Sequence, residues 1–80
     1  MLPIIIDINE NQWTKVAENV KDIYVKKLKT DVKYFVSTVL TGVSAPENFN
    51  TAHELFTEKD FEHVFQTEAI DVYIFCRDHD

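Results

Sequence analysis

The fold is decided by residues 31–41, which read DVKYFVSTVLT. The residue types in this stretch have high β-propensity, whereas the spacing of its apolar members suits one face of an α-helix better. In a strand, the alternation of side chains would leave Phe35 and Val39 beside Lys33 on one face. We therefore predict a helix over 31–41, and a strand over 32–40 is the alternative.

The preceding residues also show a helical pattern. Asn9 with Gln12 three residues later is close to a capping box, and Glu10 adds negative charge to the first turn. Apolar residues then recur at three- and four-residue steps, which is typical of one buried stripe on an α-helix. These residues are Trp13, Val16, Ala17, Val20, Ile23, Tyr24 and Leu28. A helix over 10–29 is predicted.

Both ends of the chain have the pattern of a strand. Four isoleucines follow Pro3, where a missing N–H group is tolerated, and they predict a strand over 3–8. Ile70 begins an alternation of residues that predicts a second strand over 69–76. Between the two ends, the apolar residues of 50–67 are spaced as on a helix.

The predicted fold class is therefore α+β and mostly helical, with about three to four helices. The expected elements are helices over 10–29, 31–41 and 50–67 and strands over 3–8 and 69–76. The two strands are expected to pair in a small sheet, which would satisfy their edges. The alternatives are an all-α bundle and a three-stranded α/β fold with 32–40 as a strand. Because 80 residues bury only a small core, residues 1–80 are expected to form a single small domain.

Charge is unevenly distributed along the chain, whose net charge is −6. Residues 44–80 contain nine carboxylates but only Lys59 and Arg77 as cations. Residues 15–33 instead contain six lysines and three carboxylates. Such segregation predicts an electrically polar molecule that selects its partners by charge.

The sequence contains no motif for catalysis. His53, His63 and His79 lack the spacing of a metal-ligand set, and a single glycine excludes a phosphate-binding loop. Cys76 is the only cysteine, so it cannot form an internal disulfide. The acidic balance disfavours direct binding of nucleic acid, and no run approaches the length of a membrane span. We therefore predict a cytoplasmic protein that is not an enzyme, with no cofactor, metal site or membrane association.

The functional hypothesis is a small acidic protein-binding module that inhibits or regulates a basic partner. On a helix, Glu54, Glu58 and Glu62 would form a row at four-residue steps, and their repulsion would lower helix stability. Such a row favours recognition of a positively charged groove, with electrostatic steering of the encounter. The alternative is a solvated acidic face that serves only solubility. The predicted partner-binding residues are Glu54, Glu58, Asp60, Glu62, Glu68 and Asp71.

The expected partner is a nucleic-acid-handling protein, such as a nuclease or a restriction or CRISPR component. The corresponding protein classes are phage-type inhibitors, DNA mimics, antitoxins and immunity proteins. The alternative is a non-enzymatic assembly or structural subunit that self-associates, for example as a homodimer, through the isoleucine-rich residues 3–8 or through an exposed part of the apolar stripe on the predicted helix 10–29.

Overall fold

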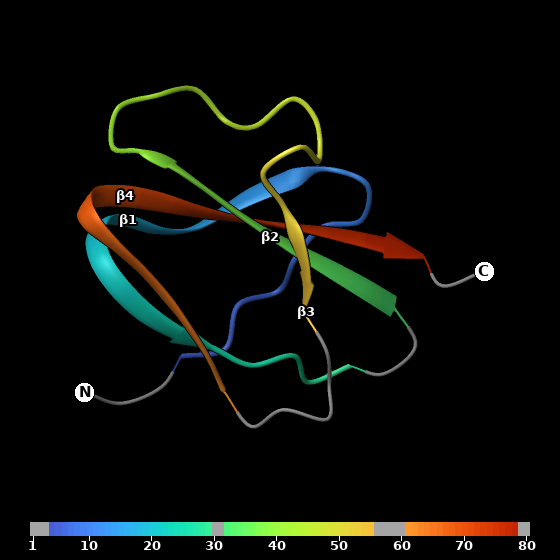
Figure 1. Cartoon of the computed structure of the whole chain (residues 1–80). Coiled ribbons are helices and arrows are strands. Elements are labelled where there is room, and N and C mark those ends of the chain that lie inside the picture. The colour runs from blue at the N-terminus through green and yellow to red at the C-terminus, as the bar shows by residue number, and fades with distance from the viewer. Residues whose placement is uncertain (1–3, 30–31, 56–60, 79–80) are drawn as a thin grey trace.

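The chain folds as one antiparallel sheet. The computed structural model describes residues 4–29, 32–55 and 61–78, and within these ranges it contains four strands and no helix. The strands are β1 (Trp13–Val25), β2 (Val32–Leu40), β3 (His53–Leu55) and β4 (Glu62–Asp78). Their order across the sheet is β1-β4-β2-β3, so the long β4 lies between β1 and β2 (Figure 1).

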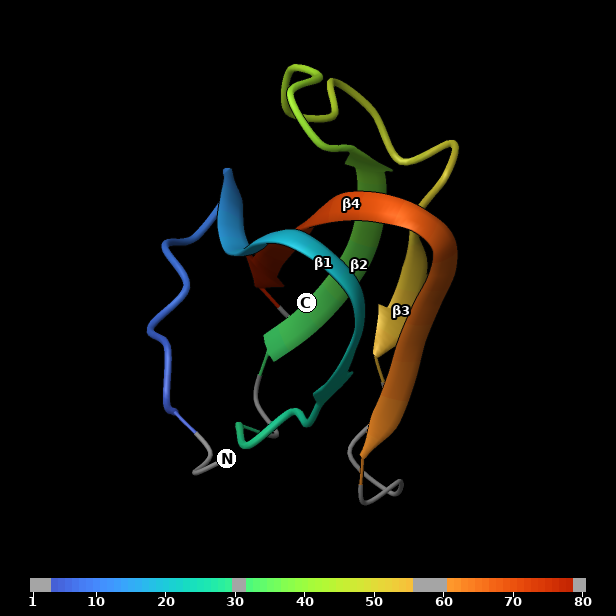
Figure 2. The same cartoon turned by 90° about the vertical axis from the view of Figure 1, so that its left-hand side faces the viewer.

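The sheet is strongly curled. β4 pairs with β1 along most of its 17 residues, whereas it pairs with β2 only from Ile70 onward. In Figure 2, β1 and β4 form arcs. Residues 4–12, which we call the N-terminal segment, lie across from the first part of β4. The register between β1 and β4 shifts three times between Lys15 and Asp22. β-Bulges bend a strand and increase its twist, so these irregularities account for the curl.

The concave face of the curled sheet carries an aliphatic core. Val36 of β2 and Val72 of β4 are completely buried at its centre. The other core residues are Val32, Tyr34, Leu55, Val64, Ile70, Ile74 and Cys76. Half-buried side chains of β1 and Ile8 of the N-terminal segment pack against them. The segment before β1 therefore contributes to the packing of the concave side, although it adds no strand.

The convex face is covered by the connection between β2 and β3. The ring of Phe49, in this connection, lies with its centroid 4.9 Å from that of Phe75, 5.3 Å from that of Phe35 and 5.4 Å from that of Trp13. We call these four residues the aromatic cluster. Edge-to-face and tilted rings at such separations stabilise one another beyond the burial of their surface. The cluster thus anchors the connection onto β1, β2 and β4.

The predicted mostly helical α+β fold is wrong, and so is the all-α alternative. Residues 13–25 of the predicted helix 10–29 form β1, and the bulges explain why they resemble a helix. Ala17 and Val20 both pack against the core, and Asn19 between them has a φ of 55°. The bulge inserts an extra residue, so two inward-facing positions are three residues apart instead of two. A bulged strand therefore reproduces the apolar spacing of a helix.

The helix predicted over 31–41 is also wrong. β2 has the bounds of the alternative strand over 32–40, although the α/β fold proposed with it is absent from the described ranges. Both faces of β2 are covered: Val36 is buried on one side, and Ser37 on the other lies with its Oγ 2.8 Å from Oγ1 of Thr51. A strand that is covered on both faces shows no clear alternation of apolar and polar residues. The β-propensity of these residues therefore predicts their structure better than the spacing of the apolar ones.

The remaining predicted elements are partly corrected. The helix over 50–67 is replaced by β3 and the start of β4, and residues 56–60 lie outside the described part of the chain. The strand over 69–76 is confirmed as part of β4, but it pairs with β1 and β2. Residues 4–8 are not in a strand, and the N-terminal segment makes one isolated bridge, from Glu10 to Cys76.

Candidate functional site

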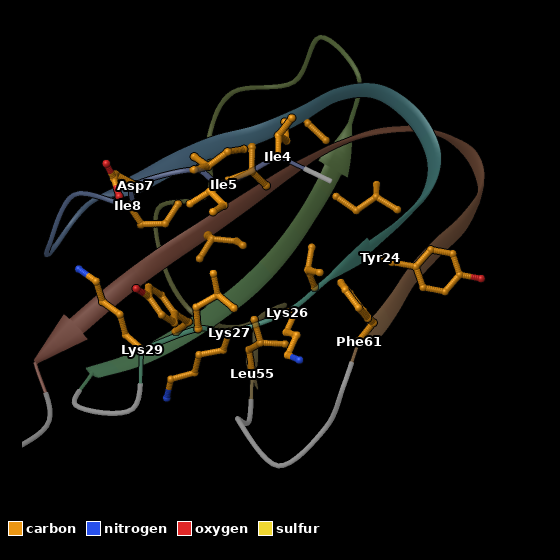
Figure 3. A pocket seen from close by; sticks show the side chains of 18 residues that line it. Ile4, Ile5, Asp7, Ile8, Tyr24, Lys26, Lys27, Lys29, Leu55 and Phe61 are labelled. Atoms are coloured by element: carbon orange, nitrogen blue, oxygen red, sulfur yellow. The ribbon is translucent and has the colours of Figure 1, made fainter. Parts of the chain in front are cut away.

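A cavity of about 470 Å³ lies between the N-terminal segment and the concave face of the sheet (Figure 3). Its volume is within the range of roughly 300–1,000 Å³ that is typical of small-molecule sites. The lining residues are predominantly apolar: Ile4, Ile5, Ile6, Ile8, Val16, Ala17, Ile23, Tyr24, Val25, Leu28, Tyr34, Leu55, Phe61 and Ile74. Asp7, Lys26, Lys27 and Lys29 complete the lining.

Side chains from the strands of the sheet line the interior of this cavity. Tyr34 of β2, Leu55 of β3 and Ile74 of β4 are buried core residues that project from the concave face. Alternation along the end of β1 directs Ile23 and Val25 to the same side. The interior of the cavity therefore borders the core, and a ligand inside it would contact buried core side chains.

Most of the exposed large apolar side chains in the described part of the chain lie around the cavity. In the described part of the chain, ten large hydrophobic side chains are exposed, and six of them line this cavity. They are Ile4, Ile5, Ile6, Tyr24, Leu28 and Phe61. Ile4 and Ile5 are 78% and 81% exposed. Exposed apolar side chains beside a cavity are typical of a binding site, because water contacts them unfavourably until a ligand covers them.

Lys26, Lys27 and Lys29 form a positively charged border of the cavity, which we call the lysine rim. The Nζ atom of Lys26 lies 5.6 Å from the ring centroid of Phe61, and that of Lys27 lies 5.7 Å from the ring centroid of Tyr34. Cation–π attraction at these distances holds both ammonium groups close to rings that line the cavity. In Figure 3 the rim lies across the cavity from the isoleucines of the N-terminal segment.

The lysine rim makes no ion pair with any carboxylate of residues 4–29, 32–55 and 61–77, where the ion pairs involve only Lys15 and His53 as cations. Among the described residues that line the cavity, Asp7 is the one carboxylate. Three of the eight cationic residues of an acidic protein thus border one apolar cavity. Sequence reasoning selected carboxylates as the binding residues and missed this site, although three lysines around Leu28 were a visible signal.

The predicted acidic row does not exist, because Glu54 and Glu62 lie on different strands. Glu54 of β3 pairs with Phe35 and so lies on the face opposite that of its neighbour His53. The carboxylate of Glu62, at the start of β4, forms an ion pair with the imidazole of His53. Glu68 is exposed on β4. Glu58 and Asp60 lie outside the described residues.

Asp71, the last of the predicted partner-binding residues, is only 2% exposed. Its Oδ1 accepts hydrogen bonds from the backbone N–H of Asn19 at 2.9 Å and from the hydroxyl of Thr41 at 3.0 Å, and Nζ of Lys15 lies 3.7 Å from its Oδ2. The Asn19 N–H is the main cause that lowers the pKa of Asp71 below its ordinary value, against the opposing effect of burial. The geometry gives this carboxylate a structural role, because it holds the bulge of β1.

Other kinds of site receive no support from the described residues. No three His, Cys, Asp or Glu side chains among them gather as metal ligands would. Cys76 is buried in the core. None of the described segments forms a helix that could span a membrane.

No protein-family model, curated protein or solved structure matches this chain. The geometry of the cavity and its rim therefore carries the functional inference.

Proposed function

We propose that this protein is a non-enzymatic binding module and that the cavity is its binding site. The observation that carries this proposal is the concentration of exposed apolar side chains around one cavity, six of ten in the described part of the chain. Full burial of such a side chain is favourable by roughly 1.5–3 kcal/mol. A ligand that covers several of them gains a driving force that the free protein lacks.

The acidic-surface hypothesis belongs to the same class of non-enzymatic binding proteins, but it uses other residues. Its support is the net charge of −6 and the exposure of Glu68. Against it, Asp71 is buried, and Glu62 is engaged by His53. Inhibition of a basic partner therefore remains a prediction, and steeply salt-dependent capture of a nuclease would support it.

Self-association is the second candidate function, and the exposure of Ile4 and Ile5 favours it. The mouths of two copies could cover each other, whereas strand addition along the edge of β1 is disfavoured. β1 is irregular and carries Lys15, Glu18 and Lys21 as exposed charges, features that protect an edge strand. Sedimentation would detect such a dimer.

The proposal is tested with N-phenyl-1-naphthylamine, a neutral probe whose fluorescence rises in apolar surroundings. Phe61 and Phe65 form a matched pair, because they are 57% and 58% exposed and only Phe61 lines the cavity. Phe61→Ala should weaken binding of the probe roughly tenfold, which corresponds to about 1.4 kcal/mol of lost contact. Phe65→Ala should leave the affinity unchanged. Absence of binding to the unmodified protein, or equal losses in both variants, would refute the cavity as the site.

A further inference from the structure

The lysine rim indicates which chemical class of ligand the cavity takes. Its three ammonium groups border a lining whose other described residues are apolar except for Asp7. Lys26 and Lys27 are additionally held beside Phe61 and Tyr34, so their charge is positioned where the apolar surface meets water. An apolar interior with positive charge at its edge is complementary to a molecule with a hydrocarbon tail and an anionic head.

We infer that the cavity binds a single-chain anionic amphiphile, with its tail against the concave face and its carboxylate, sulfate or phosphate head at the lysine rim. This inference rests on the proposed function and adds the class of ligand. The volume of about 470 Å³ suits one small molecule. The tail would contact Val25, Leu55 and Ile74, and the head would be stabilised by charge-assisted hydrogen bonds from the ammonium groups.

The charge distribution distinguishes this ligand from larger occupants. In a symmetric dimer formed through the cavity mouth, the same patch meets itself, so the lysine rims of both copies would face each other and repel. An anionic membrane surface would repel a protein whose net charge is −6. A small amphiphile is affected mainly by the local positive field, because charges beyond about 10 Å are largely screened at moderate salt.

The test compares ligands that share one tail. Dodecanoate and dodecyltrimethylammonium below their micelle concentrations, and 1-dodecanol below its solubility limit, compete with N-phenyl-1-naphthylamine on the full chain at neutral pH. Dodecanoate should displace the probe at a roughly tenfold lower concentration than 1-dodecanol, because the nearby ammonium groups stabilise an anionic head and not a neutral one. Dodecyltrimethylammonium should be the weakest competitor. Added salt should reduce the advantage of dodecanoate and leave 1-dodecanol unaffected.

Two double variants with the same change in charge test whether the preference for dodecanoate depends on the lysine rim. Lys26→Gln with Lys29→Gln should abolish the preference for dodecanoate and retain the affinity for 1-dodecanol. Lys21→Gln with Lys33→Gln is the control, since neither residue lines the cavity, and it should retain the preference. The salt dependence in the unmodified protein provides an independent measure of the anionic preference, without any substitution.

The outcomes separate this inference from the function on which it rests. Equal binding of dodecanoate and 1-dodecanol would overturn the anionic ligand and leave the binding cavity standing. Failure of every probe to bind would overturn both. Binding to vesicles of phosphatidylcholine and phosphatidylglycerol without binding of monomeric dodecanoate would assign the site to a membrane surface. A dimer that excludes the probe would assign it to a second copy, and either result would overturn the inference.

Discussion

Replacement of Phe49 by alanine tests how the convex face of the sheet is held together. The Phe49 ring contacts the rings of Trp13, Phe35 and Phe75, and its side chain connects the residues between β2 and β3 to the sheet. Each such pair contributes about 0.5–1.5 kcal/mol beyond burial. Phe49 is 41% exposed, so its burial contributes only in part. We expect Phe49→Ala to lower the free energy of unfolding by about 2–3 kcal/mol.

The assay is urea unfolding followed by tryptophan fluorescence. Trp13 is the only tryptophan, and it belongs to the aromatic cluster, so its emission reports directly on this face. In Phe49→Ala the folded-state emission should move to longer wavelength as water reaches the indole. Phe65→Ala is the control, because within the described part of the chain its ring contacts only that of His63, in a tilted arrangement at 5.7 Å. An unchanged emission with a loss below about 0.5 kcal/mol would refute the proposed role of the cluster, since surface substitutions have effects of that size.

Two further predictions concern the concave face and the bulge. Val36→Ala removes two methyl groups from a completely buried position, and we expect a loss of about 2 kcal/mol in the free energy of unfolding, measured by urea titration. Asp71→Asn tests the lowered pKa of this carboxyl group, whose ordinary value is 3.8. Because the folded state favours the ionised form, its contribution is complete above pH 3.8 and is lost as the pH falls through the lower folded-state pKa. The stability difference between Asp71→Asn and the unmodified protein should therefore be largest near neutral pH and shrink in acid; a constant difference would contradict the assignment.

The strand over 69–76 could be predicted from the sequence because β4 alternates there between apolar and other residues. The same reasoning failed for β2, since the aromatic cluster covers one face and the aliphatic core the other. The high β-propensity of the residues indicated a strand over 32–40. The helix-like spacing of the apolar residues was given more weight, and that prediction was wrong. The convex face of β2 is covered by Phe49, which lies beyond the end of this strand. The residue pattern within a strand cannot predict a contact with a residue outside it.

The candidate site was harder to predict than the fold. Sequence reasoning followed the sign of the net charge and selected carboxylates, of which Asp71 is buried and Glu62 is engaged with His53. The lysine rim and the isoleucines of the N-terminal segment, which line the cavity with it, are more than fifteen residues apart in the sequence. They meet only because the sheet curls. A local excess of positive charge in an acidic chain was nevertheless visible before the structure.

The irregularities of β1 connect the failed prediction with the proposed site. A regular strand would alternate with a period of two and would have been recognised as such, but it would also bend less. The extra residue at Asn19, held by the buried carboxylate of Asp71, shifts the inward-facing positions and lets β1 curve with β4. That curvature leaves an unfilled volume between the sheet and the N-terminal segment. The bulge that makes β1 resemble a helix in the sequence is thus part of what shapes the cavity.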